Sequence, residues 1–207
     1  MKRYVAGLVV GLVTVGTAQA GIWGIPKFTI QQSDDRFSTD GMTTITSMWN
    51  RISKKSIAGG KHIDAKGMFI EPSVIKRKAD GAIVQILFFV HNETERDSAV
   101  GEYNSLGIPS KVSFLTGEGS PIGLTIARGD RKFGDVSTYN SILGVTTRIS
   151  ETGFAEVTAD QYARIMNAPA LAAKIDGSIR SVTYEVPDIS KEFTANLKQF
   201  HDLHLKP

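Results

Sequence analysis

The chain has 207 residues, no cysteine and a formal net charge of +3. Without cysteine it has no disulfide, no thiol nucleophile, no iron–sulfur cluster and no cysteine-ligated zinc. A charge this close to neutral gives no general reason to expect nucleic-acid binding, which depends on neutralising phosphates.

Residues 1–20 have the layout of a secretory signal peptide. Lys2 and Arg3 precede an apolar run that ends at Val15, and Ala18-Gln19-Ala20 supplies the small side chains that a signal peptidase accepts. The run is shorter than the roughly 20 apolar residues of a membrane-spanning helix. We predict cleavage after Ala20, release into a bacterial periplasm or the medium, and a fall in net charge from +3 to +1 because Lys2 and Arg3 are removed.

Residues 21–207 are expected to form a single globular α+β domain. The predicted fold is a mainly antiparallel β-sheet of about seven to nine strands built from hairpins, with one helix near 158–168 and a C-terminal amphipathic helix near 189–204. Alternating apolar residues predict an extended segment at 21–30, and β-branched residues favour a strand over 43–52. The polar, glycine-bearing stretch 53–67 indicates a loop.

The clearest hairpin signal lies in the next part of the chain. Two runs rich in Ile, Val and Phe, 68–78 and 82–92, flank Ala79-Asp80-Gly81, and Asp-Gly is a strong short-range hairpin signal. The second run is apolar almost without alternation, which predicts a strand covered on both faces at the centre of the sheet. We expect the acidic residues that follow, between Glu93 and Glu102, to be exposed.

Three more hairpins are predicted downstream from apolar runs that flank turn residues. They pair 110–116 with 122–128, 143–149 with 154–157 across Ser150–Gly153, and 171–176 with 178–186, while 129–141 is predicted to be mostly loop.

Two helices complete the prediction. Thr158 and Gln161 have the spacing of a capping box, which favours a helix that Pro169 stops. Asp188 or Ser190 caps a final helix, whose apolar residues fall on one stripe that we expect to pack onto the sheet. This stripe consists of Phe193, Leu197 and Phe200.

A local cluster of basic residues is the candidate binding site, and we expect it to attract an anionic partner. Only Asp64 and Glu71 are acidic in this span, and its basic members are Arg51, Lys54, Lys55, Lys61, Lys66, Lys76, Arg77 and Lys78. The expected partner is another envelope protein or an anionic component of the envelope. A solvated loop without a partner also explains such a cluster.

The sequence shows no recognisable catalytic or cofactor motif, and we predict no catalytic residue, cofactor or metal site. His201 and His204 are three residues apart, but no third ligand is evident. The predicted function is therefore a non-catalytic binding or interaction module of the cell envelope.

Two alternatives remain open. One is an exported hydrolase of an envelope polymer, with acid and base drawn from Asp34, Asp35 or Asp40 near Trp49. The other is an inhibitor or immunity-like partner protein that uses the 53–67 loop.

Overall fold

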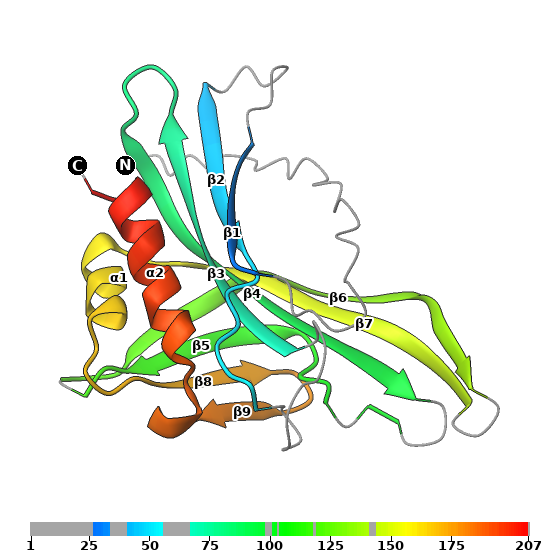
Figure 1. Ribbon diagram of the computed structural model, residues 1–207. Coiled ribbons are helices and arrows are strands. Elements are labelled where there is room, and N and C mark those ends of the chain that lie inside the picture. The colour runs from blue at the N-terminus through cyan, green and yellow to red at the C-terminus, as the bar shows by residue number, and fades with distance from the viewer. Residues whose placement is uncertain are drawn as a thin grey trace.

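The residues that the structure describes form one antiparallel β-sheet of nine strands with two helices on one of its faces (Figure 1). The computed structural model describes residues 27–33, 41–55, 67–97, 101–102, 104–117, 119–140 and 144–206. The strands are β1 (Thr29–Ser33), β2 (Met42–Met48), β3 (Gly67–Arg77), β4 (Ile83–Asp97), β5 (Pro109–Leu115), β6 (Ile122–Asn140), β7 (Gly144–Glu156), β8 (Ala172–Gly177) and β9 (Ser181–Tyr184). The helices are α1 (Ala159–Met166) and α2 (Lys191–His204), and a 3-10 turn covers Val186–Asp188. The predicted α+β class with a hairpin-built antiparallel sheet is confirmed.

The strand order is β1-β2-β3-β4-β7-β6-β5-β8-β9, and each neighbouring pair is antiparallel. β4 lies between β3 and β7, well inside the sheet, as its apolar run predicts. Its Phe88 and Val90 are fully buried beneath the helices, and Leu87, which points to the other face, is 8% exposed. Two pairings depart from a simple meander, because β4 pairs with β7 and β5 pairs with β8.

Two predictions about the middle of the chain are wrong. Residues 129–140 continue β6, and Ser150–Gly153 lies inside β7 rather than at a hairpin turn. The turn-like composition has a packing reason at Gly153, where an added Cβ would collide with the Cγ2 atom of Ile126 on β6. The glycine is therefore required by the close approach of two strands.

Glu93 is also buried, against the prediction of an exposed acidic segment. It continues β4 and is 5% exposed, because Arg148 on the neighbouring β7 forms an ion pair with its carboxylate. A paired carboxylate can be buried at this position, whereas an unpaired one would be strongly disfavoured.

Both helices begin as predicted. The Thr158 hydroxyl accepts the Gln161 N–H at 3.2 Å, and the Gln161 side chain accepts the Thr158 N–H at 3.0 Å. Ser190, rather than Asp188, caps α2 by accepting the Phe193 N–H at 3.1 Å. These caps satisfy amides that have no partner within the first turn of a helix.

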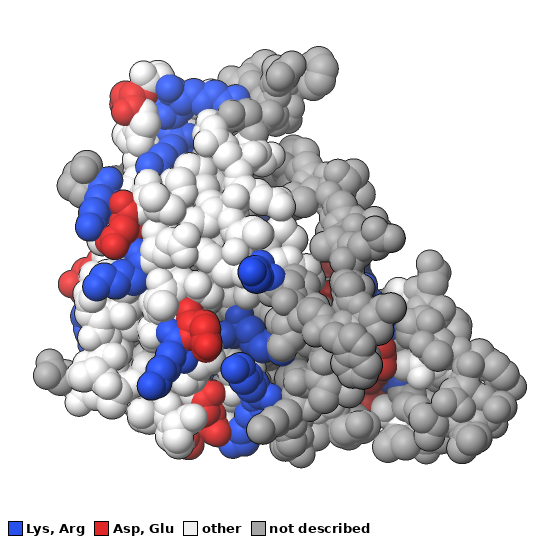
Figure 2. All heavy atoms as spheres, viewed as in Figure 1, with Lys and Arg blue, Asp and Glu red and all other residues white. Residues whose placement is uncertain are grey.

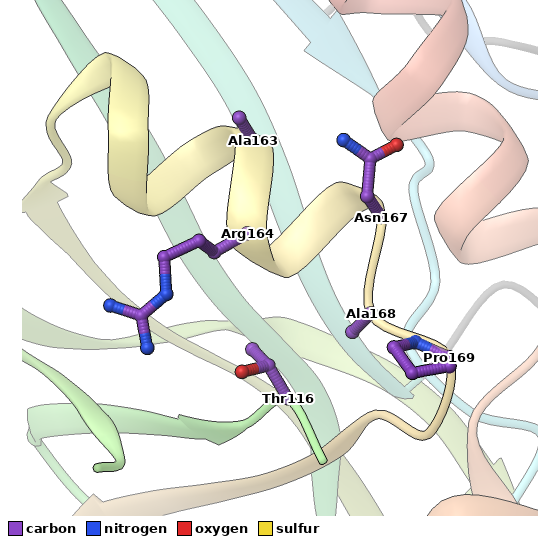
Figure 3. A pocket seen from close by; sticks show the side chains of 6 residues that line it. All are labelled: Thr116, Ala163, Arg164, Asn167, Ala168 and Pro169. Atoms are coloured by element: carbon purple, nitrogen blue, oxygen red, sulfur yellow. The ribbon is translucent and has the colours of Figure 1, made fainter. Parts of the chain in front are cut away.

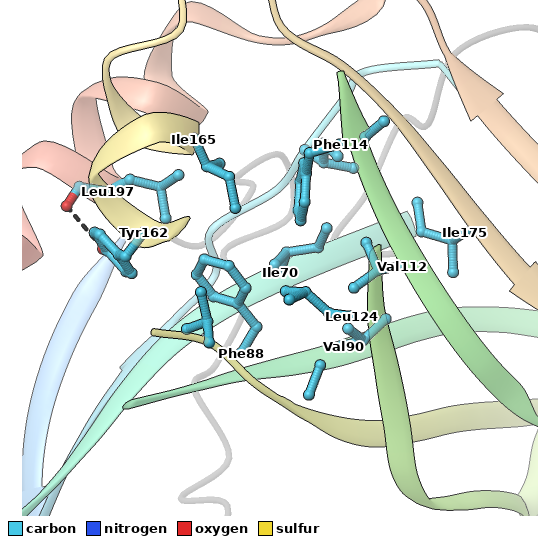
Figure 4. Close-up of a cluster of buried hydrophobic side chains, with 14 of the residues drawn as sticks. Ile70, Phe88, Val90, Val112, Phe114, Leu124, Tyr162, Ile165, Ile175 and Leu197 are labelled. Atoms are coloured by element: carbon cyan, nitrogen blue, oxygen red, sulfur yellow. Dashed lines mark hydrogen bonds between the residues drawn. The ribbon is translucent and has the colours of Figure 1, made fainter. Parts of the chain in front are cut away.

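The main core lies between the sheet and the helices (Figure 4). The three apolar residues predicted for the stripe of α2, Phe193, Leu197 and Phe200, are fully buried in it. Tyr162 of α1 packs on Phe88 of β4 with ring centroids 5.5 Å apart, and its hydroxyl donates to the Leu197 carbonyl at 2.9 Å. This bond joins the two helices above the sheet.

Candidate interaction site

Residues 76–84, which we call the hairpin tip, bring together three of the eight basic residues that the sequence singles out. Lys76 and Arg77 end β3, Lys78 begins the turn, and Asp80 is the one carboxylate in this segment. In Figure 1 the tip lies at the end of the β3–β4 hairpin beside the C-terminal end of α2, and Figure 2 shows Lys and Arg side chains gathered at that end of the molecule. The tip therefore carries an excess of positive charge.

The other predicted basic residues that the structure describes do not join the tip. Lys54 and Lys55 lie near the opposite end of α2, where Lys55 pairs with Asp188 at 2.8 Å and lowers the pKa of that carboxyl, mainly through this hydrogen bond. Lys61 and Lys66 lie outside the described residues. The cluster is thus divided in space between two ends of a helix that is roughly 20 Å long.

Arg51 is also separate from the tip, and its side chain is buried. It is 8% exposed and lies over the ring of Phe69, with the guanidinium carbon 5.3 Å from the ring centroid. The backbone of Arg51 forms an isolated β-bridge with Phe69 near the start of β3, whereas Arg77 is the last residue of the same strand. At about 3.3 Å per residue, eight residues of strand place these two positions about 26 Å apart.

The backbone of the tip is closed by a compact set of hydrogen bonds. The Arg77 N–H donates to the Ala82 carbonyl at 2.9 Å, and the Gly81 N–H donates to the Arg77 carbonyl at 2.8 Å. Gly81 has a φ of +71°, a conformation that glycine adopts without steric cost. These bonds close the predicted Asp-Gly turn between β3 and β4.

Asp80 fixes the turn from within. Its carboxylate accepts the Ala82 N–H at 3.0 Å and the Arg77 Nη1 donor at 2.7 Å. The Ala82 N–H is the main reason that the pKa of Asp80 is lowered, and Arg77 adds to the effect. Asp80 therefore stays ionised at neutral pH and orients Arg77 along the tip.

The tip also exposes two adjacent apolar side chains. Ile83 is 41% exposed and Val84 is 50% exposed, and both begin β4. The register between β3 and β4 shifts here, since Ile75 lies across from Gln85 and Lys76 lies across from Ile83. Such a bulge twists a strand locally, and this one presents apolar groups beside the cations.

Lys76 connects the tip to the last turn of α2. Burial lowers the pKa of His204 in that turn, and the nearby Lys76 ammonium lowers it further. His204 is in the last turn of α2, so Lys76 lies close enough to that turn to interact with it electrostatically.

A second group of ionisable residues lies on the face of the sheet away from the helices. The Glu71 carboxylate accepts the Trp49 N–H at 2.7 Å. Burial raises the pKa of Glu71 to about 8, and the nearby Glu93 carboxylate raises it while the Trp49 N–H opposes the shift. Trp49 has a φ of +68°, an uncommon conformation for a large side chain, so the Glu71 contact accompanies a strained backbone.

His91 lies in the same group but lacks the geometry of a catalytic relay. Its Nε2 atom is 3.4 Å from the Ser150 hydroxyl and 3.7 Å from the Glu93 carboxylate. A serine relay needs the hydroxyl and the acid on opposite ring nitrogens. Burial lowers the pKa of His91, and Arg148 adds to this lowering while Glu93 opposes it.

The most extensively bonded buried carboxylate is Glu151 on β7, which is fully buried. It accepts hydrogen bonds from three residues of the segment before β5 and from two neighbouring strands. The donors are the Asn92 side chain, the Ser105 hydroxyl, the Leu106 and Gly107 N–H groups and Arg131 Nε. Glu151 therefore secures residues 105–107 against the sheet.

A shallow hollow of about 300 Å³ lies beside the last turn of α1 (Figure 3). Arg164 extends across it and donates to the Ser120 carbonyl at 3.4 Å. Arg164 favours an anion here, whereas the carboxyl end of α1 favours a cation. The hollow therefore specifies no ligand charge, and it is lined by Thr116, Ala163, Arg164, Asn167, Ala168 and Pro169.

The remaining candidates from the sequence lie partly outside the described structure. Asp34, Asp35 and Asp40 are outside the described residues, as is the greater part of the 53–67 loop. His201 stacks near Tyr162 and contacts Asp202 at 3.3 Å. Across the described ranges, no three His, Asp or Glu side chains are grouped as metal ligands, and no helix is long and apolar enough to span a membrane.

Comparison with known proteins gives no relative. The chain matches no family model, no curated protein and no solved structure.

The sequence identified the cations of the tip, but it did not predict the exposure of Ile83 and Val84 or the hydrogen bonds of Glu151. Ile83 and Val84 read as members of a buried strand, and their exposure follows from the position of the hairpin end beyond the core. Their direct succession to the Asp-Gly turn is the signal that would have marked them as exposed. The Glu151 site has no local signal, because its donors are 20 to 59 residues away in the chain.

Proposed function

We propose that this chain is a non-catalytic interaction module of the bacterial cell envelope, and that its hairpin tip contacts an anionic component there. The observation that carries the proposal is the grouping of Lys76, Arg77 and Lys78 at one hydrogen-bonded hairpin end with a single carboxylate. A fixed cluster of charge raises the local concentration of an anionic partner and speeds its association.

The bonding of the buried acids supports an interaction role over a catalytic one. Glu151 accepts five hydrogen bonds from its own chain, and Glu93 pairs with Arg148. These carboxylates stabilise the sheet and its connections. A catalytic carboxyl must instead be placed where it reaches a substrate.

Binding to a soluble polyanion tests the proposal. We expect fluorescently labelled dextran sulfate to bind the purified protein, and the Arg77→Gln/Lys78→Gln variant to bind it at least fivefold more weakly at low salt, because two contact charges are lost. The matched control is Lys54→Gln/Lys191→Gln, which removes the same charge from two exposed residues near the other end of α2. Equal weakening in the two variants would show a diffuse charge effect and contradict a site at the tip.

The envelope location is part of the proposal and has a separate test. The basic start, apolar run and Ala18-Gln19-Ala20 site of the first 20 residues support export. We expect N-terminal sequencing of the protein from a bacterial periplasmic or secreted fraction to begin at Gly21. A chain retained in the cytoplasm with Met1 intact would contradict export.

A further inference from the structure

The hairpin tip places apolar side chains directly beside its cations. Ile83 and Val84 are each at least 41% exposed, and they lie across the hairpin from Lys76 at the register shift. Within the described part of the chain, no other two strongly exposed large apolar residues are adjacent in sequence. A soluble polyanion makes no use of such side chains, because its contacts are electrostatic.

We propose that the anionic component recognised by the tip is the surface of a lipid layer with negatively charged headgroups. This inference rests on the proposed function and names the partner of the same site. The cations contact the headgroups, while Ile83 and Val84 enter the boundary between headgroups and acyl chains. Lysine and arginine suit this position, because their aliphatic stems lie along apolar groups while their charged ends stay among polar ones.

The shape of the tip fits a flat surface better than an enclosed ligand. It is the end of a two-stranded hairpin, and in Figure 1 its turn projects past the C-terminal end of α2. The last turn of that helix exposes Leu203, which is 61% exposed. Apolar groups thus occur on both elements at this end of the molecule.

The rigidity of the tip favours contact with the surface. The Asp80 carboxylate and the Gly81 N–H already fix the turn, and the Lys78 N–H donates to the Gly41 carbonyl at 2.7 Å. Little conformational entropy is therefore lost when the tip contacts the lipid. The charges and the apolar groups act together from one preformed element.

Vesicle sedimentation separates this inference from the proposed function. The probes are vesicles of 1:3 phosphatidylglycerol and phosphatidylcholine, vesicles of phosphatidylcholine alone, and dextran sulfate. We expect binding to the anionic vesicles and far weaker binding to the neutral ones. The Arg77→Gln/Lys78→Gln variant should bind the anionic vesicles more weakly, by about fivefold for each cation that is removed.

The decisive variant is Ile83→Thr/Val84→Thr, which keeps β-branched side chains on the strand and removes apolar area. We expect its binding to anionic vesicles to fall about tenfold, with dextran sulfate binding unchanged within about twofold, because the charges remain. The matched control is Leu115→Thr/Ile179→Thr, at two positions exposed by 52% and 51% on other parts of the surface. The control is expected to bind vesicles like the wild-type protein.

Three outcomes of these binding experiments would contradict one or both proposals. Wild-type affinity of Ile83→Thr/Val84→Thr for anionic vesicles would overturn the lipid inference. Binding of the wild-type protein to dextran sulfate but not to anionic vesicles would also overturn it and leave the proposed function standing. Binding to neither probe would overturn both.

Discussion

The Glu151 carboxylate accepts a hydrogen bond from the backbone N–H of Gly107 at 2.8 Å, although the two residues are 44 positions apart. Leu106 N–H donates to the same carboxylate at 2.7 Å, and Arg131 pairs with it at 3.1 Å. A single buried side chain thus joins β7, β6 and the segment that leads into β5. The position of that segment depends on the negative charge.

Replacing Glu151 with Gln should destabilise the fold by about 2 kcal/mol or more, because the amide cannot accept from all five donors and Arg131 keeps only Glu102 as a charged partner. Urea unfolding followed by circular dichroism measures this change. The control is Glu156→Gln, an exposed position on the same strand, which should stay within about 0.5 kcal/mol of the wild-type protein. A Glu151→Gln protein as stable as this control would contradict the assigned role.

Glu71 makes stability depend on pH in the opposite sense to an ordinary ion-paired carboxylate. Its pKa is about 8 in the folded protein and 4.5 without the fold, so between these values the folded state holds a proton that the unfolded state has lost. The contribution of Glu71 to stability is therefore greatest below pH 4.5 and is lost as the pH rises to 8, by up to about 5 kcal/mol.

The Glu71→Gln variant tests this dependence, because glutamine keeps the acceptor for the Trp49 N–H without the ionisation. We expect its free energy of unfolding to exceed that of the wild-type protein by an amount that increases from pH 5 to pH 8.5. Urea titrations at both pH values provide the comparison. A constant difference between the two proteins would mean that Glu71 titrates as an ordinary carboxyl.

The two buried tyrosines should respond differently to loss of their hydroxyl groups. Tyr162→Phe removes the bond to the Leu197 carbonyl between α1 and α2 and should lower stability by about 1 kcal/mol. The hydroxyl of Tyr184 is buried without a hydrogen-bond partner among the described residues, so Tyr184→Phe should be neutral or stabilising. Thermal unfolding of the two variants under one condition tests the contrast, and equal destabilisation would refute it.

Alanine substitutions at Gly153 and Gly134 should also differ in their effect on stability. Gly153→Ala should destabilise by about 1–3 kcal/mol, because its methyl group would collide with Ile126. At Gly134 an added Cβ would lie 3.5 Å from the Cβ of Arg148, which is ordinary contact, so Gly134→Ala should be tolerated. Differential scanning calorimetry compares the two, and a tolerated Gly153→Ala would show that β6 and β7 separate more easily than their packing implies.

Local signals in the sequence predicted the elements whose structure is determined locally. The Asp80-Gly81 turn, the Thr158 capping box and the apolar stripe of α2 each depend on neighbours a few residues away, and the structure confirms them. Ser150–Gly153 has the composition of a turn but lies inside β7, because pairing with β4 and β6 outweighs that local preference. Such pairing involves residues far apart in the sequence.

The candidate site was predictable in charge but not in position. The basic residues from Arg51 to Lys78 are close in sequence, yet β3 runs between them and places Phe69, the β-bridge partner of Arg51, about 26 Å from Arg77. Of the cluster residues with a described position, only Lys76, Arg77 and Lys78 remain together, at the end where Ile83 and Val84 are exposed. The positions of these groups depend on the direction in which β3 runs. A count of charges along the sequence does not give that direction.

A two-dimensional nitrogen–proton NMR titration with dextran sulfate locates the contact, because backbone amide shifts report it residue by residue. We expect the largest shifts at Arg77 to Val84, with smaller ones at the last turn of α2. Shifts confined to Lys54, Lys55 and the first turn of α2, or no shifts at any residue, would contradict a site at the tip.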